Sequence, residues 1–245
     1  MNAIRRIALV ASVSALAGAA HAQSPPVVHL TGVYEGSLLV KLLDVRSDFI
    51  LGPLDYRAGA RAHSSGPVDF VHPFSVLAQS QGVIRGRAAA PVGFLVVGGR
   101  KRRSVDFRGK PAAFGADPLS QLVRISLNDP SPCVGSMIFF DGKQRYRMSF
   151  SPLGPGALTP AQKSLPLSAP TTCRLGFQPL SGLANRGGAP STVLRGESTA
   201  TFARSNLAKV WVLSRVEIGT ILGPARIELT NFTASSSQGA LVRRR

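Results

Sequence analysis

Short runs in which every second residue is apolar follow one another through most of the chain, and they constrain its fold more than any other feature. In residues 54–63, for example, Tyr56 and Ala58 fall on one side, whereas Arg57 and Arg61 fall on the other. A period of two predicts a strand with one buried face. About ten to thirteen such strands, joined by short links, are expected, so the sequence predicts an all-β chain.

The predicted strands lie at residues 27–36, 37–45, 54–63, 74–86, 91–98, 103–109, 137–140, 143–150, 173–180, 209–216 and 226–234. Helices do not alternate with them, which favours an antiparallel sheet. A large antiparallel sheet has to curl or close, because exposed strand edges pair with other chains. The expected architecture is a curled sheet that forms an open or spiral β-barrel, and a two-sheet β-sandwich is the alternative.

One short helix interrupts this pattern at residues 117–126 (DPLSQLVRIS). Asp117 can cap the amino end, and Pro118 suits the first helical position because its missing N–H has no partner there. Leu119 and Leu122 then recur at helical spacing, so we expect a single helix at this point. We place it, as a hypothesis, at one mouth of the barrel.

The amino terminus has the pattern of a secretory signal peptide. Arg5 and Arg6 precede an uncharged apolar run, and Ala20-His21-Ala22 presents small residues at the cleavage positions. The run is shorter than the roughly 20 apolar residues of a membrane span. We therefore predict a signal peptide at residues 1–22 and an exported, periplasmic product.

Residues 23–245 are expected to form a single β-rich domain. Residues 152–170 are rich in Pro, Gly and Ser and lack an apolar period, which predicts a flexible, exposed loop. The polar tail at residues 235–245, which ends in three arginines, is expected to be frayed.

The only two cysteines, Cys133 and Cys173, both lie in the exported part of the chain. Cysteine pairs in an oxidising compartment usually form disulfides, and this one would close a loop of about 40 residues. No histidine stands near either cysteine, so a metal site is not predicted.

The residues between the cysteines contain Asp141-Gly142, the dipeptide that a two-residue type I′ hairpin turn prefers. That turn would pair Phe140 with Lys143. Met137, Phe139, Tyr146 and Met148 would then share the core face of the hairpin.

The chain is strongly basic, with 29 Lys and Arg against 12 Asp and Glu and a formal net charge of +17. Nucleic acid is the usual partner of such a balance. Export and the lack of aromatic residues among the cations argue against that partner. Lipid headgroups, lipopolysaccharide and other polyanions of the envelope fit better.

Four consecutive cations, Arg100, Lys101, Arg102 and Arg103, follow Gly98-Gly99 near the tip of a predicted hairpin. They are candidates for an anionic contact, because guanidinium groups match phosphate oxygens in pairs. The alternative is a solvated tip whose charge discourages pairing of the strand edge.

Signs of catalysis are sparse in the sequence. His29, His63 and His72 stand apart from one another, and neither a G-x-S-x-G elbow nor an HExxH metal motif occurs. No catalytic residue, metal or cofactor is predicted. A carboxylate site formed by Glu35, Asp44 and Asp48 stays open as a route to hydrolysis.

Small residues on the inner strand faces, Ala58, Ala60, Ala62 and Ala88 to Ala90, leave room for a cavity inside a curled sheet. Barrels of this kind can hold one small or lipid-like ligand. A filled interior without a ligand is the alternative.

Several motifs resemble the exported bacterial family DUF3108, a domain of unknown function. The motifs are Asp117-Pro118-Leu119-Ser120, Pro132-Cys133, Phe140-Asp141-Gly142-Lys143-Gln144-Arg145-Tyr146 and Cys173, with Tyr34-Glu35-Gly36, Tyr56-Arg57 and Ser80-Gln81-Gly82 before them. The resemblance covers most of residues 30–230. It implies an exported envelope protein with a β-rich fold and without an assigned enzyme activity, and it supplies no catalytic residue.

These observations favour a non-enzymatic periplasmic protein of the cell envelope that binds a hydrophobic or anionic component, such as a lipid or lipopolysaccharide. The first alternative is a scaffold that binds another periplasmic protein through a strand edge or the basic tip. The second is a hydrolase with a carboxylate site.

Overall fold

The computed structural model describes residues 26–71, 73–181, 197–220 and 223–237. These residues form one antiparallel sheet of twelve strands in the order β6-β5-β4-β3-β2-β1-β12-β11-β10-β9-β8-β7. The strands are β1 Val27–Leu38, β2 Val40–Leu51, β3 Asp55–Ser64, β4 Ser75–Arg85, β5 Ala88–Gly98, β6 Lys101–Asp106, β7 Gly135–Phe140, β8 Arg145–Pro155, β9 Leu167–Ser181, β10 Ser198–Ser205, β11 Trp211–Thr220 and β12 Gly223–Ser237. The predicted signal peptide, His72 and the three terminal arginines lie outside the described residues.

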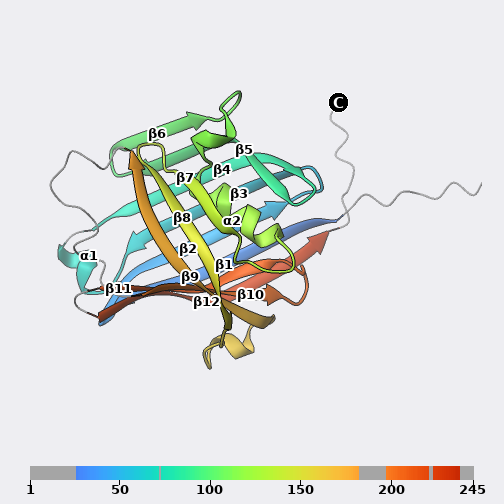
Figure 1. The fold of residues 1–245 in the computed structure, drawn as a ribbon. Helices are drawn as coiled ribbons and strands as arrows, with labels where there is room; N and C mark the ends of the chain where they lie inside the picture. Colours follow the sequence, from blue (N-terminus) through green and yellow to red (C-terminus); the bar gives the residue numbers. More distant parts are fainter. Residues whose placement is uncertain (1–25, 72, 182–196, 221–222, 238–245) are drawn as a thin grey trace, which may run out of the picture.

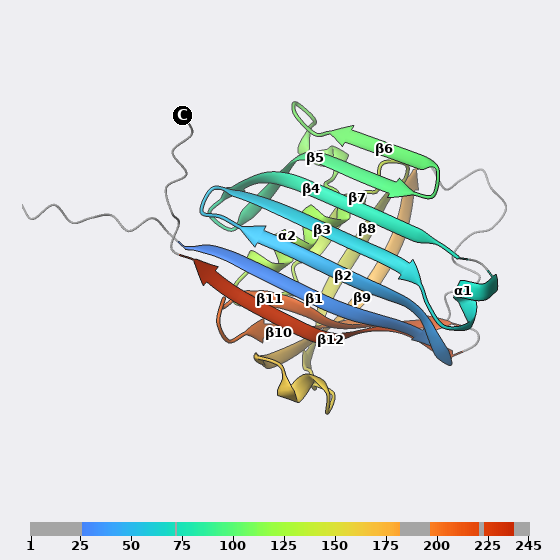
Figure 2. The same ribbon diagram turned by 180° about the vertical axis from the view of Figure 1, so that it is seen from behind.

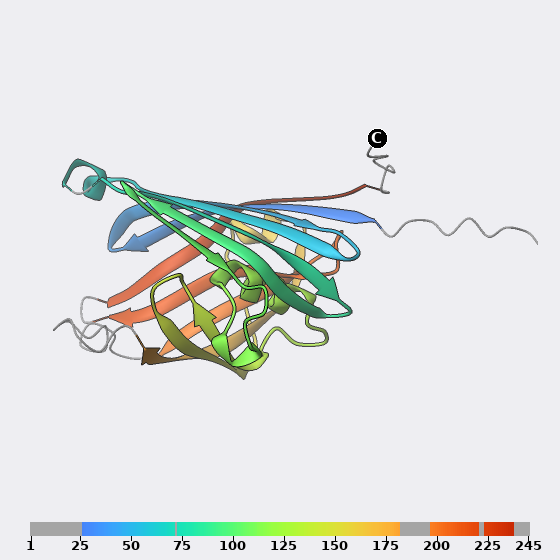
Figure 3. The same ribbon diagram turned by 90° about the horizontal axis from the view of Figure 1, so that it is seen from above.

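The sheet curls on itself into an open barrel, as predicted (Figure 1). Seen from above, strands β1 to β6 form one wall, and β7 to β11 face them across the interior (Figure 3). Hydrogen-bonded ladders continue through β1, β12 and β11, so the two walls belong to one sheet rather than to a two-sheet sandwich. The remaining edges, β6 and β7, do not pair with each other.

The predicted helix is α2, Pro118–Leu127, and it lies inside the curl against both walls (Figure 3). The carboxylate of Asp117 caps it by accepting a hydrogen bond from the Ser120 amide at 3.0 Å. Leu119, Val123 and Ile125 are buried against the sheet. The helix therefore fills part of the barrel interior, rather than only covering a mouth.

A second short helix, α1 at Pro67–Val71, was not expected, because no apolar helical period marks this segment. Two 3-10 turns were also not expected, η1 at Ala112–Phe114 and η2 at Gln162–Ser164. No helix in the described part of the chain is long and apolar enough to cross a membrane.

The β7–β8 hairpin corrects the predicted turn. Phe140 pairs with Arg145 instead of Lys143, so the loop has four residues rather than two. The carboxylate of Asp141 accepts hydrogen bonds from the amides of Lys143 and Gln144, at 2.8 and 2.7 Å, and so stabilises the longer loop. The register moves by two residues, which leaves each side chain on its predicted face.

Three further predicted boundaries differ from the structure. The break between the first two strands falls at Leu39, not at Gly36. Gly36 stays within the ladder opposite Leu43, and its lack of a side chain leaves room for the Leu43 side chain. β10 forms at Ser198–Ser205, where no strand was predicted. The connection predicted at residues 152–170 is shorter, since β8 runs to Pro155 and β9 begins at Leu167.

Residues 107–117 follow β6 and lie along the free edge of β7. We call this region between the two unpaired edges the seam. On the β7 side, the Ala116 amide donates to the Ile138 carbonyl at 3.1 Å, and the Phe140 amide donates to the Ala116 carbonyl at 2.9 Å. The rings of Phe107, Phe114 and Phe140 pack edge to face beside these bonds, with centroids between 4.8 and 6.5 Å apart. Backbone and aromatic contacts thus cover the free edge of β7.

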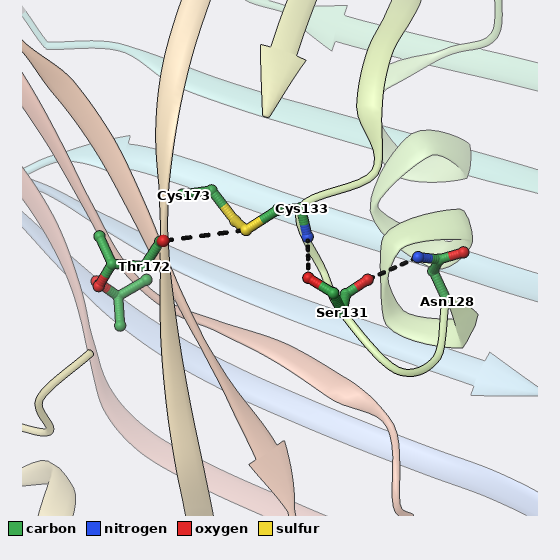
Figure 4. Close-up of a disulfide and its surroundings, with 6 residues drawn as sticks. Asn128, Ser131, Cys133, Thr172 and Cys173 are labelled. Atoms are coloured by element: carbon green, nitrogen blue, oxygen red, sulfur yellow. Dashed lines mark hydrogen bonds between the residues drawn. A yellow bond between two sulfur atoms is a disulfide. The ribbon is translucent and has the colours of Figure 1, made fainter. Parts of the chain in front are cut away.

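A disulfide joins Cys133 to Cys173, with an Sγ–Sγ distance of 2.06 Å, in agreement with the pairing expected from the sequence (Figure 4). Cys173 is fully buried on β9, and Cys133 lies in the connection from α2 to β7. Within that connection, Asn128 donates to the Ser131 carbonyl, and the Cys133 amide donates to Ser131 Oγ. The bond therefore ties the segment that follows the internal helix to the facing wall.

Candidate ligand cavity inside the barrel

An apolar cavity of about 190 Å³ lies beside α2 in the barrel interior. Its wall comes from α2 and from strands β1, β2, β3, β10, β11 and β12. The apolar side chains that line it are Leu30, Val45, Phe49, Ala60, Leu119, Leu122, Phe202, Trp211, Val212, Leu213, Ile227 and Phe232. This composition suits an apolar guest, because cavities of about 150 Å³ with similar walls hold small apolar molecules.

The space exists because short side chains face α2 at this point. Of the alanines that predicted an interior space, Ala60 lines this cavity. On α2, Leu119, Leu122 and Ser126 are three or four residues apart, so they share one face of the helix and line the cavity with Ala60. Ala89 and Ala90 line a separate hollow of about 510 Å³ near the seam.

Trp211 lines the cavity, and its indole N–H is buried without a hydrogen-bond partner in the part of the chain that the structure describes. The residue is 5% exposed, and its Nε1 is one of two buried side-chain polar atoms without a partner in the described residues, Ser65 Oγ being the other. The Arg204 guanidinium lies over the indole ring, 5.6 Å from its centroid. A buried N–H without a partner is costly.

Tyr34 and Ser47 supply the main polar groups on the β1–β2 side of the cavity. Burial raises the pKa of Tyr34 to about 12, although its hydrogen bond with Ser47 acts in the opposite direction. The phenol is therefore neutral at ordinary pH. Gly32 lies beneath the ring, where a Cβ would come within 2.8 Å of Tyr34 Cε2, so glycine at this position lets the ring lie against the strand.

A buried polar cluster holds α2 in place next to the cavity. Ser80 Oγ donates to the Asp117 carboxylate at 3.0 Å, and Ser120 Oγ makes a short hydrogen bond to the same carboxylate. The hydroxyls of Tyr56 and Ser120 are 2.6 Å apart. Gly82 leaves room for the Tyr56 ring in this cluster, because a Cβ at position 82 would lie 2.5 Å from the Tyr56 hydroxyl.

Two titratable groups in this cluster have raised pKa values. Burial raises the pKa of Asp117, and the hydrogen bonds from Ser120 and Ser80 only partly oppose the shift. Burial likewise raises the pKa of Tyr56 to about 12. Ser120 is buried, and its hydroxyl is already bonded to Asp117 and Tyr56, so the cluster anchors the helix rather than facing solvent.

Several of the motifs that resemble DUF3108 lie next to one another in the structure, although they are far apart in the sequence. They supply the members of the buried polar cluster, which are Tyr56, Ser80, Gly82, Asp117 and Ser120. Pro118 stands at the first turn of α2. The motif therefore positions the helix that lines the cavity.

The motif at residues 140–146 holds the segment that precedes α2. The Arg145 guanidinium donates to the Phe114 carbonyl at 3.2 Å and also bonds the Ala113 carbonyl. Tyr146 packs between Phe139 and Phe177, with both ring centroids 5.3 Å away, and burial raises its pKa to about 12. Gly142 adopts a φ of 86°, which favours glycine in the turn.

The remaining candidates from the sequence lie outside the barrel. All four cations of the tip are exposed: Arg100 lies in the turn from β5 to β6, and Lys101, Arg102 and Arg103 begin β6. His29 and His63 are exposed too, and His63 Nε2 lies 3.7 Å from Asp44 Oδ2. None of these side chains reaches the cavity.

The carboxylates proposed for hydrolysis meet only in part. Lys41 Nζ bridges Glu35 and Asp44, at 3.1 and 2.7 Å, and both carboxylates are partly exposed. Asp48 lies apart, bonded by Thr31 and Arg46. The described residues contain no group of three or more His, Cys, Asp or Glu placed to hold a metal.

Sequence reasoning missed most of the cavity wall. The strand β10, which carries Phe202, was not expected at all, and Trp211 was not singled out. The one available signal was that the sole tryptophan lies in the strand predicted at residues 209–216. Which strands face each other across the interior depends on the curl of the whole sheet, which local periodicity does not encode.

The sequence matches no family model and no curated protein, so the resemblance to DUF3108 stays a prediction. Among solved structures, the chain is similar to a β-barrel-like protein of domain of unknown function DUF1849 from Brucella abortus, with 9% identity over 87% of this chain and 100% of that one and a TM-score of 0.46. It is also similar to a hypothetical protein from Chlamydia trachomatis, with 12% identity over 90% and 93% of the two chains and a TM-score of 0.35. Neither description assigns a function, and both likenesses are too weak to bear on the site.

Proposed function

We propose that the chain is a non-enzymatic periplasmic protein of the cell envelope that binds a hydrophobic envelope component inside its barrel. The observation that carries this proposal is the apolar cavity of about 190 Å³ in the barrel interior. Such a site suits the end of an acyl chain or a small apolar fragment of a lipid.

The chemistry of the wall sets the class of ligand. Pockets for small molecules are mostly apolar, with a few polar groups that fix the orientation of the guest. Here the polar groups come from Tyr34, which is neutral, and from Ser47 and Ser126. The cavity is smaller than the roughly 300 Å³ of common drug-sized sites, so a chain end fits it better than a whole lipid.

A short-chain ester tests the cavity directly, because Trp211 is the only tryptophan and reports on its own surroundings. Ethyl hexanoate is expected to change the intrinsic fluorescence in a saturable way. Ala60→Leu should fill the space and weaken binding at least about tenfold, since the added methylenes compete for the same apolar contacts.

Ala89→Leu is the matched control, because it adds the same atoms beside the separate hollow near the seam. It should bind the ester as the unaltered protein does. Equal binding by Ala60→Leu, or no saturable change in fluorescence, would contradict the proposal. Osmotic-shock fractionation tests the periplasmic location separately, and native mass spectrometry of the released protein would show a copurified lipid.

A further inference from the structure

Three connections gather at one end of the barrel, the end opposite to the start of β1 and the end of β12 (Figure 2). They are the β1–β2 turn, the β3–β4 connection that contains α1, and the β5–β6 turn. All three belong to consecutive neighbours in the sheet, so they form a continuous rim.

Large apolar side chains project from the first two connections. Phe70 and Val71 on α1 are 92% and 85% exposed, and Leu39 in the β1–β2 turn is 86% exposed. Val40 and Phe74 are also exposed beside them. We call these five residues the apolar tip. Single exposed apolar residues are common, but a group of five on neighbouring turns indicates a contact surface.

Backbone hydrogen bonds hold the apolar tip together. The Ser65 amide donates to the Leu42 carbonyl at 2.9 Å, which joins the α1 connection to the start of β2. The Ser64 amide donates to the Phe74 carbonyl at 3.0 Å, and Ser64 Oγ donates to Asp69 at 2.6 Å. The side chains are therefore presented on a defined frame.

The third connection places the four cations of the basic turn (residues 100–103) next to the apolar tip. Val76 at the start of β4 pairs with Gly98, and Gly98 pairs with Lys101. Neighbouring strands are about 4.8 Å apart, so Lys101 lies only about 10 Å from the strand that follows Phe74. No carboxylate of the described residues forms an ion pair with these four cations.

The acids on this rim, Glu35, Asp44 and Asp69, offset part of that charge, and Lys41 bridges the first two. Five cations (Lys41 and residues 100–103) against these three carboxylates leave an excess of two positive charges. The rim therefore combines exposed aromatic and aliphatic groups with a net positive charge. This combination is typical of proteins that lie on a membrane surface, where the apolar groups enter the headgroup boundary and the cations attract anionic lipids.

We propose that this end of the barrel docks on an anionic phospholipid bilayer, with the apolar tip in the interface and the basic turn against the headgroups. The proposal goes beyond ligand binding in the cavity and does not depend on it. The charge complementarity of the basic turn selects an anionic lipid surface over a neutral one.

Cosedimentation of the full-length mature protein with vesicles tests the proposal. Binding is expected to vesicles that contain phosphatidylglycerol, and only weakly to pure phosphatidylcholine. Arg100→Gln combined with Arg102→Gln should weaken binding about tenfold or more, as should Phe70→Ser combined with Val71→Ser. Added salt should weaken it as well, because the attraction is screened.

Matched controls come from the rest of the barrel. Leu54 and Leu207 are exposed apolar residues in turns at the opposite end, so Leu54→Ser with Leu207→Ser removes similar groups. Arg57→Gln with Arg85→Gln removes two exposed cations elsewhere. Both control variants should bind vesicles as the unaltered protein does.

A tryptophan at position 70 reports insertion itself. In Phe70→Trp, vesicles with brominated acyl chains should quench the new indole, whereas the buried Trp211 should stay unquenched in the unaltered protein. No binding to anionic vesicles, or an equal loss of binding in the variants and their controls, would overturn the proposal. Binding to vesicles that stays unchanged in every variant at this end would also overturn it, because the vesicles would then bind elsewhere on the protein.

Discussion

Replacement of Cys133 and Cys173 by alanine is expected to lower the free energy of unfolding by about 4 kcal/mol, which is the value for a disulfide that closes a loop of this length. The cross-link spans 40 residues and removes loop-closure entropy from the unfolded chain. Alanine is the better substitute, because Cys173 is fully buried and a serine would bury a hydroxyl. Urea denaturation with and without reductant measures the difference.

The reductant provides the control for this variant. Reduction of the unaltered protein should lower its denaturation midpoint toward that of the double variant and leave the variant unchanged. A double variant as stable as the oxidised protein would show that the loop is already ordered without the bond. At this chain length each kcal/mol moves the melting temperature by about 2–4 °C, so thermal unfolding should show a drop of roughly 10 °C.

Asp117→Ala is expected to cost about 3 kcal/mol or more, because one carboxylate serves three donors inside the barrel. It caps α2 through the Ser120 amide and accepts the hydroxyls of Ser80 and Ser120. Alanine removes the cap and leaves the hydroxyls without their acceptor. Circular dichroism during urea denaturation gives the free energy. The cavity should change as well, since α2 lines it.

Asp117→Asn separates the contribution of the negative charge to stability from the contribution of the helix cap. Asparagine caps a helix about as well as aspartate does, so this variant should lose much less stability than Asp117→Ala. An equal loss in both variants would show that the negative charge is needed.

The raised pKa of Asp117 gives a pH dependence with a definite sign. The folded state holds this proton more tightly than the unfolded state, in which the pKa is near 3.8. The contribution of this group to stability is therefore greatest below that value and decreases as the pH rises through the folded-state pKa. Asp117→Asn should remove this decrease, and denaturation at a series of pH values checks it. A pH profile that stays the same in the variant would contradict the assignment.

Local signals in the sequence predicted the elements of the fold well. Alternation placed Tyr56 and Ala58 on the buried face of β3, where both are found. The Asp117-Pro118 pair marked the start of α2 to within one residue. These predictions succeed because strand faces and helix caps depend on neighbouring residues alone.

Non-local features were harder to predict. The turn after Phe140 has four residues because Asp141 bonds two following amides, although the dipeptide alone favours two residues. The cavity wall joins Ala60 to Trp211, which are about 150 residues apart in the sequence. No local pattern encodes which strands a curled sheet brings face to face, so the site could be predicted only as an interior space of unknown position.

The seam gives the barrel a property that a closed barrel lacks. In a closed barrel the number of strands and their stagger fix the circumference, and a larger guest would have to break a ladder along a whole strand. Here the circumference is interrupted where Ala116 and three phenylalanine rings bridge the two edges. A wider circumference would therefore cost the contacts at the seam and leave every strand ladder intact.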